Sequence, residues 1–342
     1  MVNLAPSWKV ISFVSAFSLG VFLILYQHFE EKHVHALPLG FSKFNLSDPP
    51  PSCARWKDNM PAARDSSTFR LYIEARRIWR SKIEWQLTRN EAERILSDVS
   101  KAAELGDWGA RSLMAHFYLD GLGVLESNRV LDADPKKAVE IQRTAAEAGQ
   151  PWGLYDLGVA YEYGYGGVPQ DTVIAWSYYL RAAKLGSPEA QMALASAYRN
   201  AGRFEDEATM LRCAYSQEFG KAAYELGMIA KVQERFKDAI IYFQQGVKFG
   251  SEDCAAILWR LFEVGHWPRP TEKEQEALRA LRISVDTERS ERYRVISEAL
   301  KVNPDLKLRR LDLVLPLPPD EVPTWSGVSD ATEPEWSDPP TY

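Results

Sequence analysis

A short pattern of small, aliphatic and aromatic residues recurs five times between Ala102 and Gly265. In each copy a small residue is followed by further apolar or small residues four, five and eight places later. This spacing puts all four on one face of a helix. A unit with one apolar face has no core of its own, so the sequence predicts an all-α solenoid of stacked helix pairs. The copies begin at Ala110, Gly153, Ala190, Ala222 and Cys254.

The first two copies are longer than the others because each contains an inserted loop rich in glycine. These loops span 121–134 and 164–171, and each leads into the second helix of its pair. Glycine permits the positive φ angles of tight connections between antiparallel helices. Gly149, Gly186 and Gly250 stand where the second helices are expected to end. The glycines therefore indicate turns, and no strand precedes them as a phosphate-binding loop would require.

The second copy carries a specific family resemblance. Its motif resembles the Sel-1-like repeat, a relative of the tetratricopeptide repeat, and the third and fourth copies lack the glycine loop. The resemblance implies a right-handed α-solenoid of helix-turn-helix repeats that binds other proteins and is not an enzyme. The residues that carry it are Ala145-Ala-Glu-Ala-Gly149, Leu157-Gly158, Tyr161, Gly164-Tyr-Gly166, Asp171, Ala175-Trp176 and Tyr179.

The amino terminus contains the one long apolar run, from Val10 to Tyr26 and extendable to Phe29. Such a run is just long enough to span a bilayer. We expect residues 1–30 to form a cytoplasmic stub and a transmembrane helix within 10–29, at the bacterial inner membrane with the remainder periplasmic. A signal peptide cleaved after Val34-His-Ala36 stays an alternative. Residues 31–60 are interpreted as a proline-rich linker, a stiff spacer between membrane and domain.

The remaining boundaries follow from capping and proline patterns. Residues 61–105 are predicted to form capping helices, with a capping box at Thr88-Arg-Asn-Glu91, and residues 106–268 the repeats. Residues 269–342 are predicted to form two further helices and an extended proline-rich tail. The tail, through Val314-Leu-Pro-Leu-Pro-Pro and Trp325, resembles a C-terminal domain of unknown function. That resemblance implies a link to immunity proteins of type VI secretion.

Composition and motif searches exclude several functions. The net charge of −6, with no basic stripe, argues against nucleic acid as a partner. Catalytic motifs and paired cysteine–histidine spacings are absent from the sequence, so we expect no enzyme activity, cofactor, metal ion or small-molecule substrate. His28, His33 and His35 cluster beside the apolar run, but no cysteine lies near them and we expect no metal there. Three cysteines allow at most one disulfide, and Cys254 is expected to be a buried free thiol.

The first helices of the repeats are expected to line the concave, partner-binding surface. Their polar positions and nearby aromatic residues are candidate contacts, although each tryptophan has inter-repeat packing as a rival role. The candidate partner-binding residues are Trp108, Arg111, His116, Trp152, Asp156, Tyr163, Tyr165, Arg199 and Glu225.

Two functions fit these features. The first is a membrane-anchored periplasmic immunity protein that neutralises a type VI secretion effector, a lipase that attacks phospholipids, by steric occlusion. The second is a structural adaptor that organises envelope protein complexes through the same solenoid surface. The two differ in their partner, which is a cognate secreted effector in the first and resident envelope proteins in the second.

Overall fold

The computed structural model describes residues 36–60 and 64–332. The chain divides into two units, Met1–Gly40 and Phe41–Tyr342, and residues 36–40 are the described part of the first. The predicted membrane anchor at 10–29 and the three histidines at 28, 33 and 35 lie outside the described residues. Among the helices that are described, none is long and apolar enough to cross a membrane. The second unit contains every helix of the described residues.

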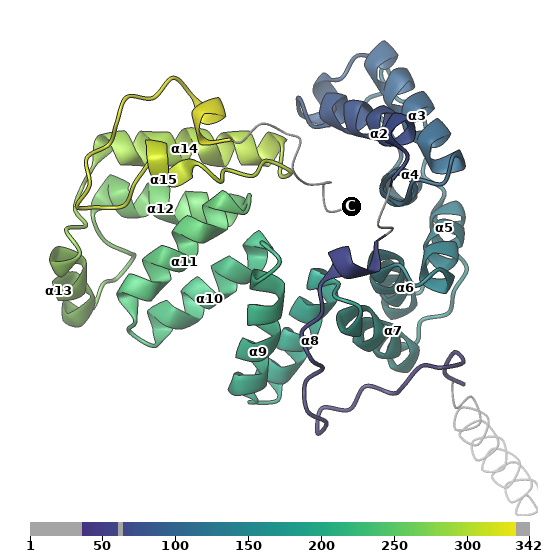
Figure 1. Cartoon of the computed structure of the whole chain (residues 1–342), viewed down its shortest axis with the longest axis horizontal. Helices are drawn as coiled ribbons and strands as arrows, with labels where there is room; N and C mark the ends of the chain where they lie inside the picture. The colour runs from purple at the N-terminus through teal and green to yellow at the C-terminus, as the bar shows by residue number, and fades with distance from the viewer. Residues whose placement is uncertain (1–35, 61–63, 333–342) are drawn as a thin grey trace, which may run out of the picture. The chain divides into compact units, whose positions relative to one another are not determined.

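The second unit is the expected all-α solenoid. Consecutive helices pack against one another along the chain, and Figure 1 shows them following one another in a curved row from α2 to α12. A single bridge between Leu122 and Leu131 is the β-type pairing in the described residues. The helices are η1 (Trp56–Asn59), α2 (Ser66–Trp79), η2 (Glu84–Gln86), α3 (Arg89–Glu104), α4 (Trp108–Asp120), α5 (Pro135–Glu147), α6 (Pro151–Tyr163), α7 (Thr172–Lys184), α8 (Pro188–Asn200), α9 (Phe204–Tyr215), α10 (Gly220–Val232), α11 (Phe236–Lys248), α12 (Glu252–Val264), α13 (Glu272–Ala280), α14 (Thr287–Val302), α15 (Leu311–Val314) and η3 (Val328–Ala331).

Local capping explains where many of the helices begin. The side chains of Asp107, Asp171 and Ser187 each accept a hydrogen bond from the backbone N–H three residues on, which satisfies a donor at the helix start. The capping box between Thr88 and Glu91 is present at the start of α3. Helix starts are thus determined by residues adjacent in the sequence.

The small residues of the repeated pattern mark close approaches between helices. A Cβ atom on Gly153 would lie 2.4 Å from Ala145 Cβ of α5, and one on Gly158 would lie 2.7 Å from the Tyr179 ring of α7. Side chains at these positions would push the helices apart. The small residues of the pattern therefore lie where the first helix of one pair packs closely against its neighbours.

Residues 41–60, which we call the N-terminal strap, run along α7, α8 and α9 and contact all three helices. Cys53 forms a disulfide with Cys213 of α9, and the Phe44 ring stacks on Trp176 of α7 with centroids 5.0 Å apart. Trp56 is buried, with 1% of its surface exposed. The linker expected over 31–60 is therefore wrong for residues 41–60, because their aromatic and cysteine side chains bind the repeats.

Backbone and amide groups complete the attachment of the strap. The Trp56 N–H donates to Gln217 Oε1 at 2.8 Å, and Asn59 Nδ2 donates to the Leu185 carbonyl at 2.6 Å. Gly186 lies directly beneath, since a Cβ there would meet the Arg55 carbonyl carbon at 2.3 Å. The strap is thus held by covalent, apolar and polar contacts together.

Gly186→Ala is expected to destabilise the domain more than Gly149→Ala. Both glycines follow a second helix with positive φ, +96° and +75°, where alanine costs about 1–2 kcal/mol. A Cβ on Gly149 meets nothing within 4 Å, whereas one on Gly186 collides with the strap and adds roughly 1–3 kcal/mol. Thermal unfolding of the two variants measures the difference. Equal Tm values for the two would contradict the docking of the strap.

The chain after α14 folds back over the end of the solenoid. Arg292 Nη1 donates to the Val314 carbonyl at 2.6 Å, and Arg289 Nε donates to the Pro316 carbonyl at 3.1 Å, so α14 fixes the proline-rich segment. The segment is extended except for α15 and η3. Leu308, Leu311 and Leu315 are buried in the core formed with α11, α12 and α14, whereas Leu313 is exposed.

Candidate functional site

A pocket of about 220 Å³ opens on the surface formed by the first helices of the repeats, which we call the inner face. Four helices contribute to its lining: α2, α4, α6 and α8. Alternate helices of a solenoid present the same side, so one pocket spans four successive units. Its lining residues are Arg76, Trp79, Arg80, Ser112, Leu113, His116, Trp152, Tyr155, Asp156 and Glu189.

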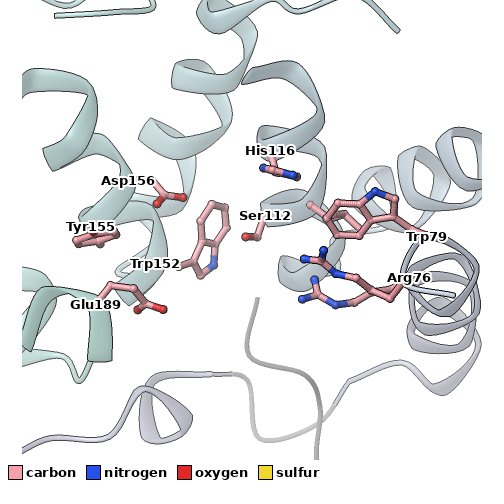
Figure 2. Close-up of a pocket in the computed structure, with 10 residues that line it drawn as sticks. Arg76, Trp79, Ser112, His116, Trp152, Tyr155, Asp156 and Glu189 are labelled. Carbon is pink, nitrogen blue, oxygen red and sulfur yellow. The ribbon is translucent and has the colours of Figure 1, made fainter. Parts of the chain in front are cut away.

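One wall of the pocket is acidic and aromatic. Figure 2 shows Asp156 and Glu189 one above the other, on the side of the Trp152 indole that faces Tyr155. Burial raises the pKa of Asp156 to about 7, and the charge of Glu189 adds to this rise. Burial also raises the pKa of Glu189, although Ser187 Oγ donates a hydrogen bond to its Oε2 at 3.0 Å. Both carboxyl groups therefore resist ionisation.

The opposite wall is basic and already has a counterion. Arg76 Nε donates to Asp305 Oδ2 at 2.6 Å, and Arg80 Nε lies 3.8 Å from the same oxygen. The Arg80 guanidinium also covers the Trp79 ring at 3.7 Å. Burial alone would raise the pKa of Asp305, but the hydrogen bond and charge of Arg76 lower it. This wall is therefore a preformed ion cluster.

His116 lies between the two walls and is neutral at pH 7. Burial lowers its pKa from the ordinary value of 6.5, and this outweighs the nearby Asp120 carboxylate, whose Oδ2 lies 3.4 Å from His116 Nδ1. A neutral imidazole carries a donor and an acceptor. His116 thus offers hydrogen bonds to the pocket without adding charge.

Three of the residues proposed from the sequence meet in this pocket: His116, Trp152 and Asp156. Trp108 instead packs beside the buried group that contains Trp152, and Arg111 stacks on the Trp108 ring at 4.4 Å. Arg111 Nε further donates to the carbonyl of Ala103. Arg111 therefore joins α4 to α3, and neither Trp108 nor Arg111 lines the pocket.

The other proposed residues lie elsewhere on the repeats. Arg199 forms ion pairs with Glu207 and with Glu225, the latter at 2.7 Å, so it bridges α8 to α9 and α10. Tyr163 is exposed at the end of α6, and Tyr165 is half-buried in the loop that follows. Burial raises the pKa of Tyr165 to about 12. None of these four residues lines the pocket, although Tyr165 lies near Asp156.

Several lining residues were missed by the sequence analysis. Aligning the copies on their first small residue puts Trp152 and Glu189 at the same place, one residue before Gly153 and Ala190. Because Trp152 was a candidate, this alignment could have indicated Glu189 as well. Arg76 and Arg80 were missed because α2 was interpreted only as a cap. The missed residues are Arg76, Trp79, Arg80, Ser112, Leu113, Tyr155 and Glu189.

A second exposed surface lies where η2 meets the first glycine loop. Trp85 is 54% exposed, and Ile83, Val124 and Leu125 are also exposed. We call these four residues the rim patch. An apolar group held at the surface in this way is typical of protein-binding sites.

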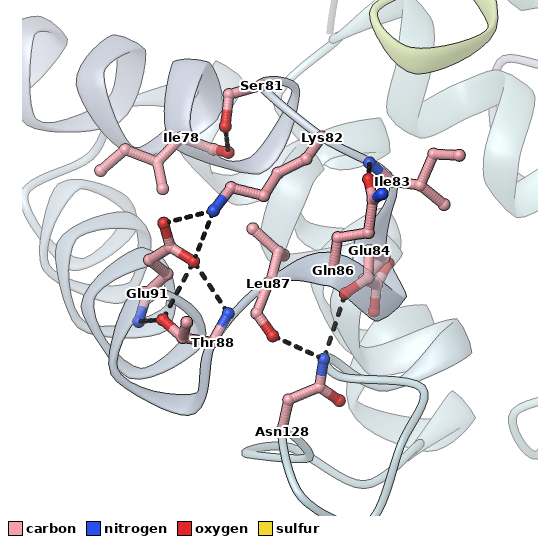
Figure 3. A network of polar contacts seen from close by, with 10 residues as sticks. All are labelled: Ile78, Ser81, Lys82, Ile83, Glu84, Gln86, Leu87, Thr88, Glu91 and Asn128. Carbon is pink, nitrogen blue, oxygen red and sulfur yellow. Dashed lines mark hydrogen bonds and ion pairs between the residues drawn. The ribbon is translucent and has the colours of Figure 1, made fainter.

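Hydrogen bonds fix the backbone beneath the rim patch, and Figure 3 shows the network. Asn128 Nδ2 donates to the Leu87 carbonyl at 2.9 Å and to the Glu84 carbonyl at 3.1 Å. Glu84 Oε1 accepts from the Gly123 N–H at 2.8 Å, and Lys82 Nζ pairs with Glu91. The patch is therefore presented on a rigid support.

Known proteins share this fold. Residues 260–340 match the family model described as a domain of unknown function, DUF6396. The crystal structure of immunity protein Pa5087 from Pseudomonas aeruginosa matches 79% of this chain and 95% of that chain, with 27% identity and a TM-score of 0.62. The solved structure of PA5086, from the same organism, matches 80% of this chain and 96% of that chain, with 28% identity and a TM-score of 0.63.

A third solved structure, immunity protein PA5088 from Pseudomonas aeruginosa, matches 79% of this chain and 95% of that chain, with 25% identity and a TM-score of 0.59. Among curated proteins, none matches this sequence. The resemblance inferred from the sequence is confirmed: the chain has the fold of the immunity proteins Pa5087 and PA5088 and ends in the expected domain of unknown function.

Proposed function

We propose that this chain is an immunity protein that binds and neutralises a secreted antibacterial effector of type VI secretion, a phospholipase. The observation that carries the proposal is the similarity to two immunity proteins, which extends over 95% of each of those chains. The chain acts by binding rather than by catalysis. The inner face and the rim patch supply a polar pocket and exposed apolar side chains, the two components of tight protein recognition.

Neutralisation occurs by steric occlusion. The partner's active-site mouth lies against the inner face and the glycine loops, so its substrate cannot enter. A rigid support favours this mechanism, because binding then loses little conformational entropy. The hydrogen bonds of Asn128 and Glu84 beneath the rim patch provide such support.

The domain is held in the periplasm by the apolar run at 10–29, which anchors it in the inner membrane. The bridge between Cys53 and Cys213 supports an oxidising compartment, where disulfides form and persist. An anchored blocker would be positioned where an enzyme that attacks membrane lipid must work.

Co-expression with the effector encoded beside its gene tests the function. Cells that export the effector to the periplasm are expected to stop growing, and the full chain is expected to restore growth. A variant lacking residues 1–35 should fail to protect, whereas the same variant given a cleavable export signal should protect at least in part. Unchanged killing by the effector in the presence of the full chain would disprove the proposal. Capture of envelope proteins from cells without the effector gene would favour the adaptor.

A further inference from the structure

The pocket on the inner face contains more carboxyl groups than cationic side chains. Among its lining residues and Asp305 there are two guanidinium groups and three carboxyl groups, and His116 is neutral. Asp305 pairs with Arg76 and Arg80, so Asp156 and Glu189 have no cationic partner among the lining residues. In the described residues, no hydrogen bond or ion pair to the carboxylate of Asp156 is present. A cation bound in the pocket would favour the ionised forms of these two carboxyl groups and pair with them.

The aromatic residues of the acidic wall match a flat cation. Asp156 and Glu189 lie between the Trp152 indole and Tyr155 in the view of Figure 2. Trp152 is 1% exposed and forms the buried base of this wall, whereas Tyr155 is half-buried and supplies aromatic surface. A guanidinium group stacks on aromatic faces while its edge donates paired hydrogen bonds to carboxylates. An ammonium group satisfies the charge but not the stacking. The volume of about 220 Å³ accommodates one side chain rather than a folded segment.

We infer that this pocket receives one arginine side chain of the partner protein, with its guanidinium held by Asp156 and Glu189 beside Tyr155. This inference rests on the proposed function, because the arginine belongs to the effector. The pocket, which we also call the arginine socket, would then hold a single buried side chain of the partner. Such side chains contribute most of the binding free energy at protein interfaces.

Binding of the arginine is coupled to release of a proton. Asp156 has a pKa of about 7 in the free protein, and a bound cation favours its ionised form. Binding should therefore weaken by about tenfold from pH 8 to pH 6, as a proton displaces the cation. The groups that face Asp156 and Glu189 are Arg76, Arg80, His116, Tyr155 and Tyr165, together with the exposed Lys221 of α10 near Glu189.

Asp156→Asn is expected to weaken effector binding without destabilising the fold. The raised pKa means that the folded state loses stability as pH rises from about 4 to about 7, since only the unfolded state then releases the proton freely. The amide removes this loss, so the Tm at pH 8 should equal or exceed that of the wild type. Glu189→Gln is a second variant, in case Asp156→Asn fails to fold. Both variants should bind the effector at least tenfold more weakly.

N-acetyl-arginine amide probes the socket without the effector. Its titration is followed by NMR at the Trp152 indole N–H, assigned with Trp152→Phe, and N-acetyl-glutamate amide is the control. We expect saturable shifts for the arginine compound, weaker at pH 6 than at pH 8 and lost in Asp156→Asn. If the wild type binds the effector and both variants bind it equally well, the socket is wrong and the function stands. If arginine binds but no effector does, the function is wrong.

Discussion

Asp305→Ala is expected to lower the free energy of unfolding by about 3–5 kcal/mol. Arg76 is 4% exposed, and its Nε and Nη2 donate to the two Asp305 carboxylate oxygens at 2.6 and 2.9 Å. The substitution removes the carboxylate that balances this buried charge. The Tyr72 hydroxyl, 3.0 Å from Arg76 Nη1, is uncharged and does not replace it. Urea unfolding measures the change.

A surface ion pair provides the matched control for this substitution. Arg55 and Asp58 pair at 2.9 Å, but both side chains are more than half exposed. Asp58→Ala should therefore change stability by less than about 1 kcal/mol. The double variant Arg76→Met with Asp305→Ala should recover part of the loss, because no desolvated charge remains at position 76. An equal effect of Asp305→Ala and Asp58→Ala would contradict a structural role for this ion pair.

The Asp305 ion pair also predicts a pH dependence. Its folded pKa lies below the ordinary value of 3.8, so it contributes stability above that value and loses the contribution as pH falls through the lowered pKa. The wild type should lose stability on acidification below about pH 4, and Asp305→Ala should lack that part of the loss. This contact joins residues 229 positions apart, from α2 to the segment after α14. It holds the basic wall of the inner-face pocket in place.

Local features of the sequence were sufficient to predict the helices. Capping helices were predicted within 61–105, and α2 spans Ser66–Trp79. The capping box predicted a start after Thr88, and α3 spans Arg89–Glu104. Such signals depend on residues three or four apart, which interact within one helix. Two further helices were likewise predicted within 269–342, where α13 spans Glu272–Ala280 and α14 spans Thr287–Val302.

Contacts between distant residues could not be predicted in this way. Three cysteines leave the pairing open, and only the fold brings Cys53 to Cys213. The docking of the strap depends on a surface of α7 to α9 that the periodic pattern does not describe. The same limit applies to the pocket. The spacing of the repeats puts His116 and Asp156 on the exposed side of first helices, so both could be proposed from the sequence. Arg80 could not, because its place in the pocket depends on Asp305, which is distant in the sequence.

Cys53→Ser is expected to lower the free energy of unfolding by about 2–5 kcal/mol. The Cys53–Cys213 bridge joins residues 160 positions apart, so it restricts a large loop in the unfolded chain. Cys53 is exposed and serine fits in its place, while the Cys213 thiol stays buried as a small apolar group. Thermal unfolding with and without reductant measures the effect. Reductant should lower the Tm of the wild type to that of Cys53→Ser and leave the variant unchanged.

The position of the strap decides whether this loss is local or global. If the strap stabilises α7 to α9, Cys53→Ser should expose Trp56 and open residues 41–60 to protease before the repeats unfold. Gly186→Ala acts on the same contact, because its Cβ would meet the strap at Arg55. The double variant should therefore lose less stability than the sum of the two single losses, since a detached strap cannot be displaced again. Strict additivity would mean that the bridge and the strap contact act independently.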